Sequence, residues 1–437
     1  MSSKPLLNIA VIGAGVAGLS AAWMLGSRHR VTLFEANDYP GGHTHTITVR
    51  EGEGAAVREL AVDTGFIVYN EPNYPHLSAL FRHLGVSTQE SEMSFAVSLD
   101  HGRLEYAGNS LDTLFAQRAN LLRPAFLGMA SDILRFNRLA KKALDEYEPT
   151  AVTAHAESLG DMLDRHHFNL AFRHHYLLPM AAAIWSCPTE TMLRFPFLSF
   201  ARFFNNHGLL NLIDRPLWRT VVNGSRSYVD QFLASGRFEL RLNSPVEHVA
   251  RREDGVYINN ESTRFDAVVF ACHADQALAM LDSPDVKENE LLGAFEYQEN
   301  IAWLHADTAL MPRMKKVWSS WNYLGYSADA STQSTERVAV SYWMNCLQKL
   351  DTSTDYFVTL NPPNPPAKDK VIGRYVYHHP VFDAAAMQAQ TRMRELQGHR
   401  QSWYCGSYFG YGFHEDALRS AVDLAAHFDI QPPWVQA

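Results

Sequence analysis

The sequence of 437 residues has few cysteines, no long basic block, no internal repeat and no low-complexity segment. The four cysteines, Cys187, Cys272, Cys346 and Cys405, stand far apart, and no CxxC pair occurs. Neither a zinc knuckle nor a disulfide framework is indicated, so we expect no metal site and a reducing compartment, the cytoplasm. The net charge of -9 argues against nucleic acid as the main partner.

Long apolar runs are also scarce. The longest charge-free stretch runs from Pro5 to Ser27, but no cleavage-site pattern closes it, and its spaced glycines suit a binding loop better than a membrane span. Two prolines and two histidines break the next candidate, between Arg173 and Glu190. No transmembrane helix is therefore predicted. With 46% hydrophobic and 19% charged residues, the composition is that of a folded soluble protein with two domains or one interleaved body.

The N-terminal stretch IAVIGAGVAGLSAAWML combines a strand, a glycine motif and a helix. The apolar run from Leu6 to Ile12 predicts a buried parallel strand, and Val16 to Leu25 predicts a helix. In the GxGxxG motif between them, the first glycine permits a tight turn, the second lets the backbone approach a pyrophosphate, and the third allows close packing of helix on strand. The phosphates would sit on the free amides of the helix N-terminus. The expected contacts are Gly13, Gly15, Val16, Ala17 and Gly18.

A second predicted strand, Val31 to Glu35, ends in a carboxylate about 20 residues after the motif. That spacing suits a group that accepts hydrogen bonds from the adenosine ribose, so we expect contacts from Glu35 and the adjacent Ala36. A carboxylate here disfavours a 2′-phosphate, so FAD or NAD is preferred to NADP. A fold without a nucleotide is the alternative for a lone GxGxxG, and the order of strand, glycines, helix, strand and glutamate argues against it.

The segment after Glu35, EANDYPGGHTHT, contains a second glycine pair. A plain NAD domain has no need of this pair, whereas a flavoprotein must bring a further loop close to the pyrophosphate and toward the isoalloxazine. The stretch resembles the flavin-containing amine oxidase and phytoene desaturase superfamily, which usually has GGR where this chain has His43 in third place. A neutral imidazole can still donate one hydrogen bond to a phosphate, but the fixed charge is gone. We therefore expect FAD, with contacts from Gly41, Gly42, His43 and Thr44.

The C-terminal segment resembles the other half of this cofactor site. Residues 403–406 (WYCG) are similar to the superfamily's last strand and glycine, and residues 410–428 read as a loop that feeds a helix. The resemblance implies that the helix N-terminus, at Asp416 or Glu415, points at the flavin pyrimidine ring and stabilises the reduced flavin. An ordinary terminal helix on a glycine loop is the alternative. The implied contacts are Gly406, Gly412, Phe413 and His414.

Residues 237–259 alternate like two strands around a turn, and residues 265–271 form another predicted buried strand. The resemblance implies a backbone contact to adenine near Val246. It also implies non-covalent flavin, because Cys405 does not stand at the position that some amine oxidases use for covalent attachment.

The expected fold class is α/β, with a Rossmann-type FAD-binding domain of the amine-oxidase kind interleaved with an α+β substrate domain. The FAD-binding domain is expected to be discontinuous, in residues 1–90, 216–290 and 396–437. The substrate-binding domain would take residues 91–215 and 291–395.

Four motifs together resemble a narrower group: GGHTHT, DTGFIVYNEPNYPHL (residues 63–77), NNHGLL (205–210) and GYGFHEDALRSA (410–421). They are similar to bacterial FAD-dependent oxidoreductases encoded beside cyclopropane-fatty-acid synthases, and to the N-terminal oxidase-like domain of plant cyclopropane-fatty-acyl-phospholipid synthases. The resemblance implies action on acyl lipids and a lipid methyltransferase as a candidate partner. Desaturation or oxidation, redox-neutral isomerisation, amine oxidation, and a flavoprotein partner without turnover of its own all stay open.

Among the 20 histidines, His207 in NNHGLL and His378 or His379 in RYVYHHPVF are the candidate catalytic bases, because histidine titrates near neutrality. Most histidines are ordinary surface or core hydrogen-bonding groups, and His414 fits a cofactor contact equally well. His43 and His45 do not suggest a metal, because no HExxH helix accompanies them. Amine oxidation would need an aromatic cage at the flavin face, with candidates at Trp185, Tyr342, Trp343 and Tyr377.

Two further segments bear on a lipid substrate. Phe195 to Phe204 suits an acyl pocket, yet it also looks like an ordinary core segment. Thr113 to Lys142 has six Lys/Arg against one Asp, a local excess of +5. Apolar residues recur near helical spacing on both sides of Pro124, which breaks the stretch. Such a stretch can lie on anionic lipid headgroups, which is the alternative of peripheral membrane contact for a cytoplasmic protein. A solvated helix face that covers the core is the preferred interpretation of the stretch.

Overall fold

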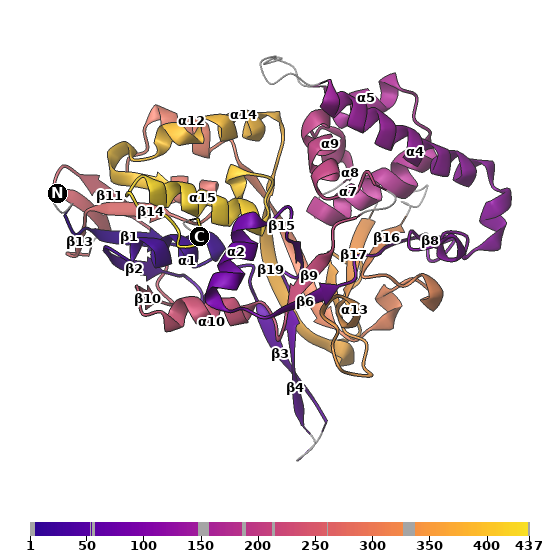
Figure 1. The fold of residues 1–437 in the computed structure, drawn as a ribbon, viewed down its shortest axis with the longest axis horizontal. Helices are drawn as coiled ribbons and strands as arrows, with labels where there is room; N and C mark the ends of the chain where they lie inside the picture. The colour runs from indigo at the N-terminus through magenta and orange to yellow at the C-terminus, as the bar shows by residue number, and fades with distance from the viewer. Residues whose placement is uncertain are drawn as a thin grey trace.

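The computed structural model describes residues 5–52, 54, 57–146, 157–185, 189–211, 215–259, 261–326 and 337–435. Figure 1 shows two bodies of secondary structure, one that includes both chain termini and one built around a larger sheet, with strands between them. Of the cysteines, Cys272, Cys346 and Cys405 are free thiols, and Cys187 lies outside the described residues.

The first body is built on a five-stranded parallel sheet. Its order is β10 (Glu239–Arg241), β2 (Arg30–Phe34), β1 (Asn8–Ile12), β14 (Ala267–Phe270) and β20 (Ser402–Tyr404). The strands are short and mostly buried, as expected for a parallel sheet covered on both faces. The predicted strands at residues 6–12, 31–35, 265–271 and 403–405 are confirmed to within two residues at each end.

Helices and a small sheet cover the two faces of the parallel sheet. One face carries α1 (Val16–Leu25), α2 (Pro75–Leu84), α10 (Arg226–Ala234) and α15 (His414–Ala426). The other face carries β11 (Val249–Arg252), β12 (Gly255–Ile258), β13 (Arg264–Phe265), α11 (Ala274–Met280), α12 (Val286–Leu292) and α14 (Ala384–Arg392). The helix α1 has the predicted bounds. Residues 237–259 differ from the two predicted strands, because β10 joins the parallel sheet and only β11 and β12 form a hairpin.

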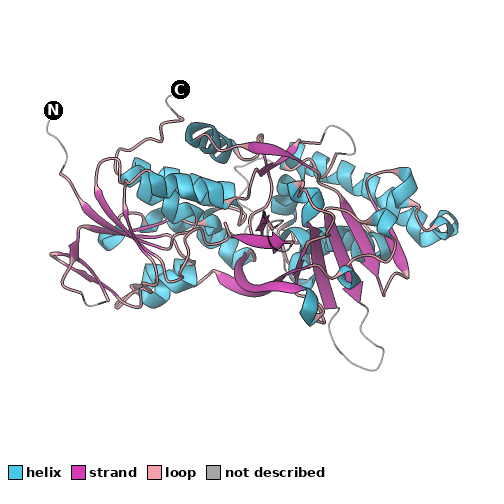
Figure 2. Cartoon of the chain, turned by 90° about the horizontal axis from the view of Figure 1, so that it is seen from below, coloured by secondary structure: helices cyan, strands magenta, loops and turns pink. Residues whose placement is uncertain are grey.

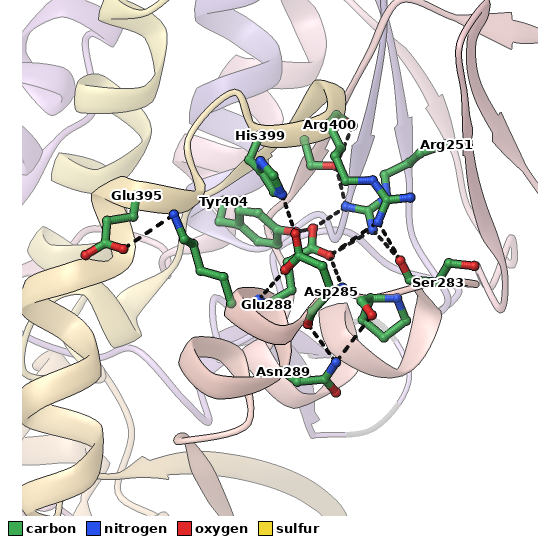
Figure 3. Close-up of polar contacts among 12 residues, drawn as sticks. Arg251, Ser283, Asp285, Glu288, Asn289, Glu395, His399, Arg400 and Tyr404 are labelled. Atoms are coloured by element: carbon green, nitrogen blue, oxygen red, sulfur yellow. Dashed lines mark hydrogen bonds and ion pairs between the residues drawn. The ribbon is translucent and has the colours of Figure 1, made fainter.

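A buried ion pair fixes the small sheet to its helix cover. The guanidinium of Arg251 on β11 pairs with the carboxylate of Glu288 on α12, and their side chains are 3% and 0% exposed. The Nη2–Oε2 distance is 2.9 Å. Figure 3 shows how Asp285, His399 and Arg400 surround this pair. A charge in the interior must be paired, so the loss of either side chain would leave the other charge buried without a partner.

The second body contains a seven-stranded sheet. Its order is β19 (Val371–Val381), β15 (Glu296–His305), β18 (Phe357–Leu360), β17 (Arg337–Trp343), β16 (Trp321–Tyr326), β7 (Phe95–Leu99) and β8 (Leu104–Ala107). All neighbours are antiparallel except β16 and β7. The helices that pack over it are α3 (Leu111–Leu114), α4 (Pro124–Asp145), α5 (Leu159–Arg165), α6 (Leu170–Phe172), α7 (Leu178–Trp185), α8 (Thr189–Leu193) and α9 (Phe197–Asn206).

The predicted acyl-pocket segment lies in the core of this body. Phe200 and Phe204 stack with ring centroids 4.2 Å apart and are at most 1% exposed. Trp185 packs on Phe203 at 4.5 Å. Most of the segment is therefore an ordinary part of the hydrophobic core. Phe203 also contacts the C-terminal loop, where its ring stacks on Phe413 at 4.9 Å.

Short strands connect the two bodies. They are the hairpin of β3 (Thr46–Glu51) and β4 (Arg58–Asp63), and a three-stranded sheet in the order β5 (Tyr69–Asn70), β9 (Trp218–Val221) and β6 (Thr88–Ser91). The helix α13 (Met344–Gln348) packs beside them. The exact domain boundaries stay a prediction. Within the described part of the chain, no helix is long and apolar enough to cross a bilayer.

Candidate functional site

The three glycines of the N-terminal loop play different structural roles. Gly13 has φ +98°, and a Cβ there would lie 2.9 Å from the carbonyl oxygen of Ala271. A Cβ on Gly18 would lie 1.8 Å from the carbonyl oxygen of Gly13. A Cβ on Gly15, in contrast, would meet no protein atom within 4 Å. The fold itself therefore requires Gly13 and Gly18, whereas Gly15 leaves space in front of the N-terminus of α1, where Val16 and Ala17 begin the helix.

The second glycine pair runs directly beside this loop. The amide of Gly41 donates to the carbonyl of Ala14 at 2.8 Å, and Gly15 and Gly41 form an isolated parallel bridge. A Cβ on Gly42 would lie 3.2 Å from the Cα of Gly15. The two glycine loops thus line one space, as a dinucleotide pyrophosphate requires.

Glu35 lies at the end of β2 and is 7% exposed. Its Oε2 accepts from the amide of Ala14 at 2.8 Å, and its Oε1 accepts from the amide and the side-chain nitrogen of Asn37 at 2.9 and 2.8 Å. A carboxylate has about four acceptor positions, and these three hydrogen bonds leave about one for a ribose hydroxyl. The glutamate also orients the phosphate loop, a role that its spacing in the sequence did not reveal.

A hollow of about 570 Å³ lies beside the end of β2. It is lined by Phe34, Arg241, Ser244, Pro245, Glu247, His248, Asn259 and Glu261. Ala36 is exposed and Val246 is buried in the chain segments beside it. Glu35, Ala36 and Val246 are not among the residues that line the hollow, so the adenosine contacts stay predictions.

The C-terminal loop is shaped by Asp416. Its Oδ2 accepts from the amides of Tyr411 and Phe413 at 2.8 and 3.1 Å, and a Cβ on Gly410 would collide with its carboxylate. Gly412 has φ +92°. The helix α15 begins at His414. Of the two residues expected at its N-terminus, Glu415 lies one residue and Asp416 two residues inside the first turn. Asp416 holds the loop from inside the first turn, as the third residue of the helix.

Glu415 has a different role. Its two carboxylate oxygens accept from the amides of His76 and Leu77, each at 2.9 Å, which are the free donors at the N-terminus of α2. At the end of β20, the amide of Gly406 donates to the hydroxyl of Ser420 on α15 at 2.9 Å.

His414 joins several segments of the predicted cofactor site. Its Nε2 contacts the hydroxyls of Thr44 and Tyr228 at 3.0 and 3.2 Å, and its ring stacks on Phe66 at 3.8 Å. Burial lowers the pKa of His414 to about 3, so the ring is neutral. One ring nitrogen is therefore committed to the protein, which leaves only Nδ1 for a cofactor.

His43 lies among other histidines. Burial, followed by the nearby His273, His414 and His378, lowers the pKa of His43 to about 3. Its ring centroid lies 5.2 Å from that of His379. The Nε2 of His43 is enclosed and has no hydrogen-bond partner among the residues that the structure describes. A buried polar atom without a partner costs free energy, so this atom indicates a missing ligand group beside the second glycine loop.

The three candidate bases are not gathered at one point. His379 is partly buried, and its pKa is lowered to about 3 by desolvation and then by His43 and His378. His378 is half exposed and lies near Glu299. His207 lies apart, stacked on Phe203 at 3.9 Å with its Nδ1 2.9 Å from that residue's carbonyl oxygen.

Sequence reasoning missed His273 and Tyr297 near this cluster, and it named Tyr377 only as a candidate for an aromatic cage. His273 precedes α11, stacks on Tyr297 at 4.1 Å and lies 6.1 Å from His378 by ring centroids. Tyr377 donates to or accepts from the hydroxyl of Thr64 at 2.7 Å. Only the pairing of distant strands brings these residues together, so no local signal could have found them.

Two of the four candidates for an aromatic cage lie on opposite faces of β17. Tyr342 packs on Trp321, while its strand neighbour Trp343 packs on Trp318. Successive residues of a strand point to opposite faces, so these two cannot line one cage. No group of three or more His, Cys, Asp or Glu side chains suited to a metal occurs in the described ranges.

Family comparison identifies the class of cofactor that these two glycine loops serve. Residues 16–354 match the family model described as flavin containing amine oxidoreductase. The chain belongs to this family. The family implies a flavin, and two features fit one: the space at Gly15 and the unpartnered Nε2 of His43.

Curated relatives match over limited regions. Lysine-specific histone demethylase 1 homolog 1 from Arabidopsis thaliana is 28% identical over 184 residues, which are 41% of this chain and 21% of that protein. L-amino-acid oxidase from Bungarus fasciatus is 58% identical over 40 residues, or 9% of this chain and 8% of that protein. The chain thus spans about a fifth or less of the length of these relatives.

Solved structures match over nearly the whole chain. The CLA-producing fatty acid isomerase from P. acnes has a TM-score of 0.68 at 14% identity, covering 98% of this chain and 100% of that one. Cyclohexylamine oxidase from Brevibacterium oxydans IH-35A has a TM-score of 0.66 at 14% identity, covering 97% and 100%. At these identities the likeness confirms the α/β flavin amine oxidase fold.

Proposed function

We propose that the protein is an FAD-dependent oxidoreductase that acts on fatty acyl chains, by desaturation or oxidation of an unsaturated or modified lipid. The observation that carries the flavin part is the open space at Gly15, lined by two glycine loops in a chain of this family. The acyl part is supported by the sequence resemblance to the group associated with cyclopropane-fatty-acid synthases. The fatty acid isomerase among the similar folds is compatible with it.

The protein's own groups would bind the cofactor at three points. The amides at the start of α1 and the Gly41–Gly42 loop would hold the pyrophosphate, and Glu35 the ribose. The N-terminus of α15 would present its partial positive charge to the flavin ring. FAD, when bound without a covalent link, supplies the electron acceptor that oxidation of a C–C or C–N bond needs.

The histidine cluster is poorly suited to take up a proton. General bases work best with a pKa near the operating pH, whereas burial keeps His43 and His379 neutral to about pH 3. Burial also lowers the pKa of His207 to about 4, against the opposing effect of the Phe203 carbonyl. Of the three candidate bases, His378 alone is half exposed. We therefore favour hydrogen-bond donation over base catalysis for His43 and His379.

Peripheral contact with a membrane is the second part of the proposal. Five of the thirteen exposed large apolar side chains among the described residues lie between β8 and the middle of α4. They are Leu111, Leu121, Leu122, Leu127 and Leu134. Leu111 and Leu122 are 76% and 87% exposed, and this segment forms one end of the molecule in Figures 1 and 2. The local excess of +5 in an acidic protein favours an anionic lipid surface as the occupant.

Vesicle sedimentation tests the membrane contact. The protein should pellet with anionic phospholipid vesicles at low salt and be released at high salt, because salt screens the charges. The double variant Leu121→Glu/Leu122→Glu should lose binding, while the control Val286→Glu, at an 85% exposed position on α12, should keep it. Equal binding of both variants would contradict this surface.

Amine oxidation is the second candidate function, favoured by the family and by folds such as cyclohexylamine oxidase. Anaerobic mixing of the oxidised holoprotein with unsaturated or methylated phospholipids and, separately, with polyamines and aromatic monoamines decides between the two. Bleaching of the flavin by lipids alone is expected. Bleaching by amines alone would overturn the acyl proposal. Isomerisation of the lipid without net bleaching would replace oxidation by a redox-neutral reaction. No response to lipids or amines would favour a partner protein for a lipid methyltransferase.

A further inference from the structure

A chain of side-chain amides ends on His379. The backbone N–H of Ile301 donates to Oδ1 of Asn361 at 2.8 Å, and Nδ2 of Asn361 donates to Oδ1 of Asn300 at 2.7 Å. Asn300 in turn places its Nδ2 2.9 Å from Nδ1 of His379. The three side chains come from β15, β19 and the residue after β18, so the sheet pairing brings them together.

The direction of every bond in this chain is determined. A backbone N–H can only donate, so the atom of Asn361 that faces Ile301 must be its oxygen, and its NH₂ group must face Asn300. The Oδ1 of Asn300 therefore accepts, and its NH₂ group faces His379. The carbonyl of Gln298, which can only accept, lies 3.2 Å from the same Nδ2 and imposes the same orientation.

His379 must then accept a hydrogen bond at Nδ1. An imidazole that accepts at Nδ1 is neutral and carries its proton on Nε2. Among the described residues, none forms a hydrogen bond with this Nε2–H, and the ring of His43 is its neighbour at 5.2 Å. The donor is thus available to a ligand beside the second glycine loop.

We propose that Asn300 and Asn361 are positioning residues that hold His379 as the neutral tautomer protonated on Nε2, so that His379 serves the site as a hydrogen-bond donor and not as a proton acceptor. The donor role rests on the proposed flavin function, because its acceptor is an atom of the bound cofactor or of the substrate. The tautomer rests on the hydrogen-bond geometry alone. Asn361 contributes further because its backbone lies at φ +49°, in the left-handed region where asparagine is favoured.

The tautomer is read directly by ¹⁵N NMR of the holoprotein labelled in its histidine rings, with His379→Gln to assign the signal. At pH 7 the signal of His379 should show an unprotonated Nδ1 and a protonated Nε2. In Asn300→Asp, the carboxylate accepts instead of donating, so Nδ1 should become protonated. In Asn361→Ala, Asn300 is free to turn and the signal should show a mixture of both tautomers.

The matched control is Asn289→Asp, the same change on the surface of α12, which should leave the His379 signal as in the unchanged protein. Thermal melting of each variant shows whether it is folded. A protonated Nδ1 or a doubly protonated ring in the unchanged protein would overturn the proposal, and so would an unshifted signal in a folded Asn300→Asp variant.

The donor role has a separate readout, the midpoint potential of the bound flavin, which needs no substrate. His379→Gln keeps an N–H donor, so its potential should stay close to that of the unchanged protein. His379→Glu brings an acceptor and a negative charge, so its potential should fall because the reduced flavin is electron-rich. Equal midpoint potentials in the unchanged protein, His379→Gln and His379→Glu would refute the donor role but not the tautomer. Neither the NMR signal nor the midpoint potential depends on which substrate bleaches the flavin.

Discussion

Replacement of Gly15 by alanine separates what the fold requires from what the cofactor requires. The backbone of Gly15 has φ −69° and ψ −179°, a conformation that alanine adopts readily, and the added Cβ would meet no protein atom within 4 Å. The apoprotein of Gly15→Ala should therefore fold normally. It should even gain about 0.4–1 kcal/mol, because alanine restricts the unfolded chain more than glycine does.

The effect on FAD should be opposite. The methyl group would occupy the space in which the backbone approaches the pyrophosphate, and it would displace the phosphates from the amides at the start of α1. A hydrogen bond to a charged group contributes about 1.5–3 kcal/mol, and each 1.4 kcal/mol is tenfold in affinity. Loss of one such bond should weaken FAD binding by about one to two decades, and loss of two by about two to four decades.

The assay pairs thermal melting of the apoprotein with titration of FAD by fluorescence. Gly108→Ala is the matched control, because its Cβ also meets open space but lies far from the glycine loops in sequence, on the strand end after β8. Gly18→Ala is the opposite control, since its Cβ would lie 1.8 Å from the carbonyl oxygen of Gly13 and should destabilise the fold itself. An unchanged FAD affinity in a folded Gly15→Ala protein would refute the assignment of this space to the pyrophosphate.

Three further predictions concern the cofactor, the core and pH. Glu35→Ala should weaken FAD binding by about one to two decades, because it removes the acceptor of the ribose hydroxyls, and an unchanged dissociation constant would exclude that role. Glu288→Ala should leave the buried charge of Arg251 unpaired and lower the free energy of unfolding by about 3–5 kcal/mol, measured by urea titration; a loss below about 1 kcal/mol would mean that Arg251 finds another partner. The pKa values of His43 and His379 are about 3 in the folded protein but near 6.5 when unfolded, so protons bind preferentially to the unfolded chain. Their contribution to stability is present above pH 6.5 and is lost as pH falls toward 3, at up to about 1.4 kcal/mol per pH unit for each histidine. Urea titrations at pH 7.5, 6 and 5 should show this decline in the apoprotein, and a flat profile would contradict neutral buried rings.

The glycine loops were predictable because their chemistry is local. The strand from residue 8, the helix from Val16 and the carboxylate of Glu35 follow one another within a single supersecondary unit, whose spacing is set by the phosphate-binding turn. Residues 41–42 could be assigned to the same site because the resemblance covered them. The family was accordingly predicted correctly, while the narrower lipid-associated group stays a prediction.

The rest of the site depends on contacts between distant segments. His379 meets His43 across 336 positions, and Asn300 and Asn361 reach it only because β15 pairs with both β18 and β19. No periodicity encodes such a meeting. The roles of Glu415 and Asp416 were misjudged for a related reason, because a carboxylate near a helix start can serve its own first turn or the start of a neighbouring helix, and only packing decides between them.

Release of the cofactor tests the central claim most directly. The purified protein should be yellow, and acid precipitation should leave intact FAD in the supernatant, close to one per chain, because we expect the two glycine loops and Glu35 to hold it without a covalent link. Flavin that stays with the precipitate would contradict non-covalent binding. A colourless protein that binds NAD in its place would contradict the flavin assignment itself.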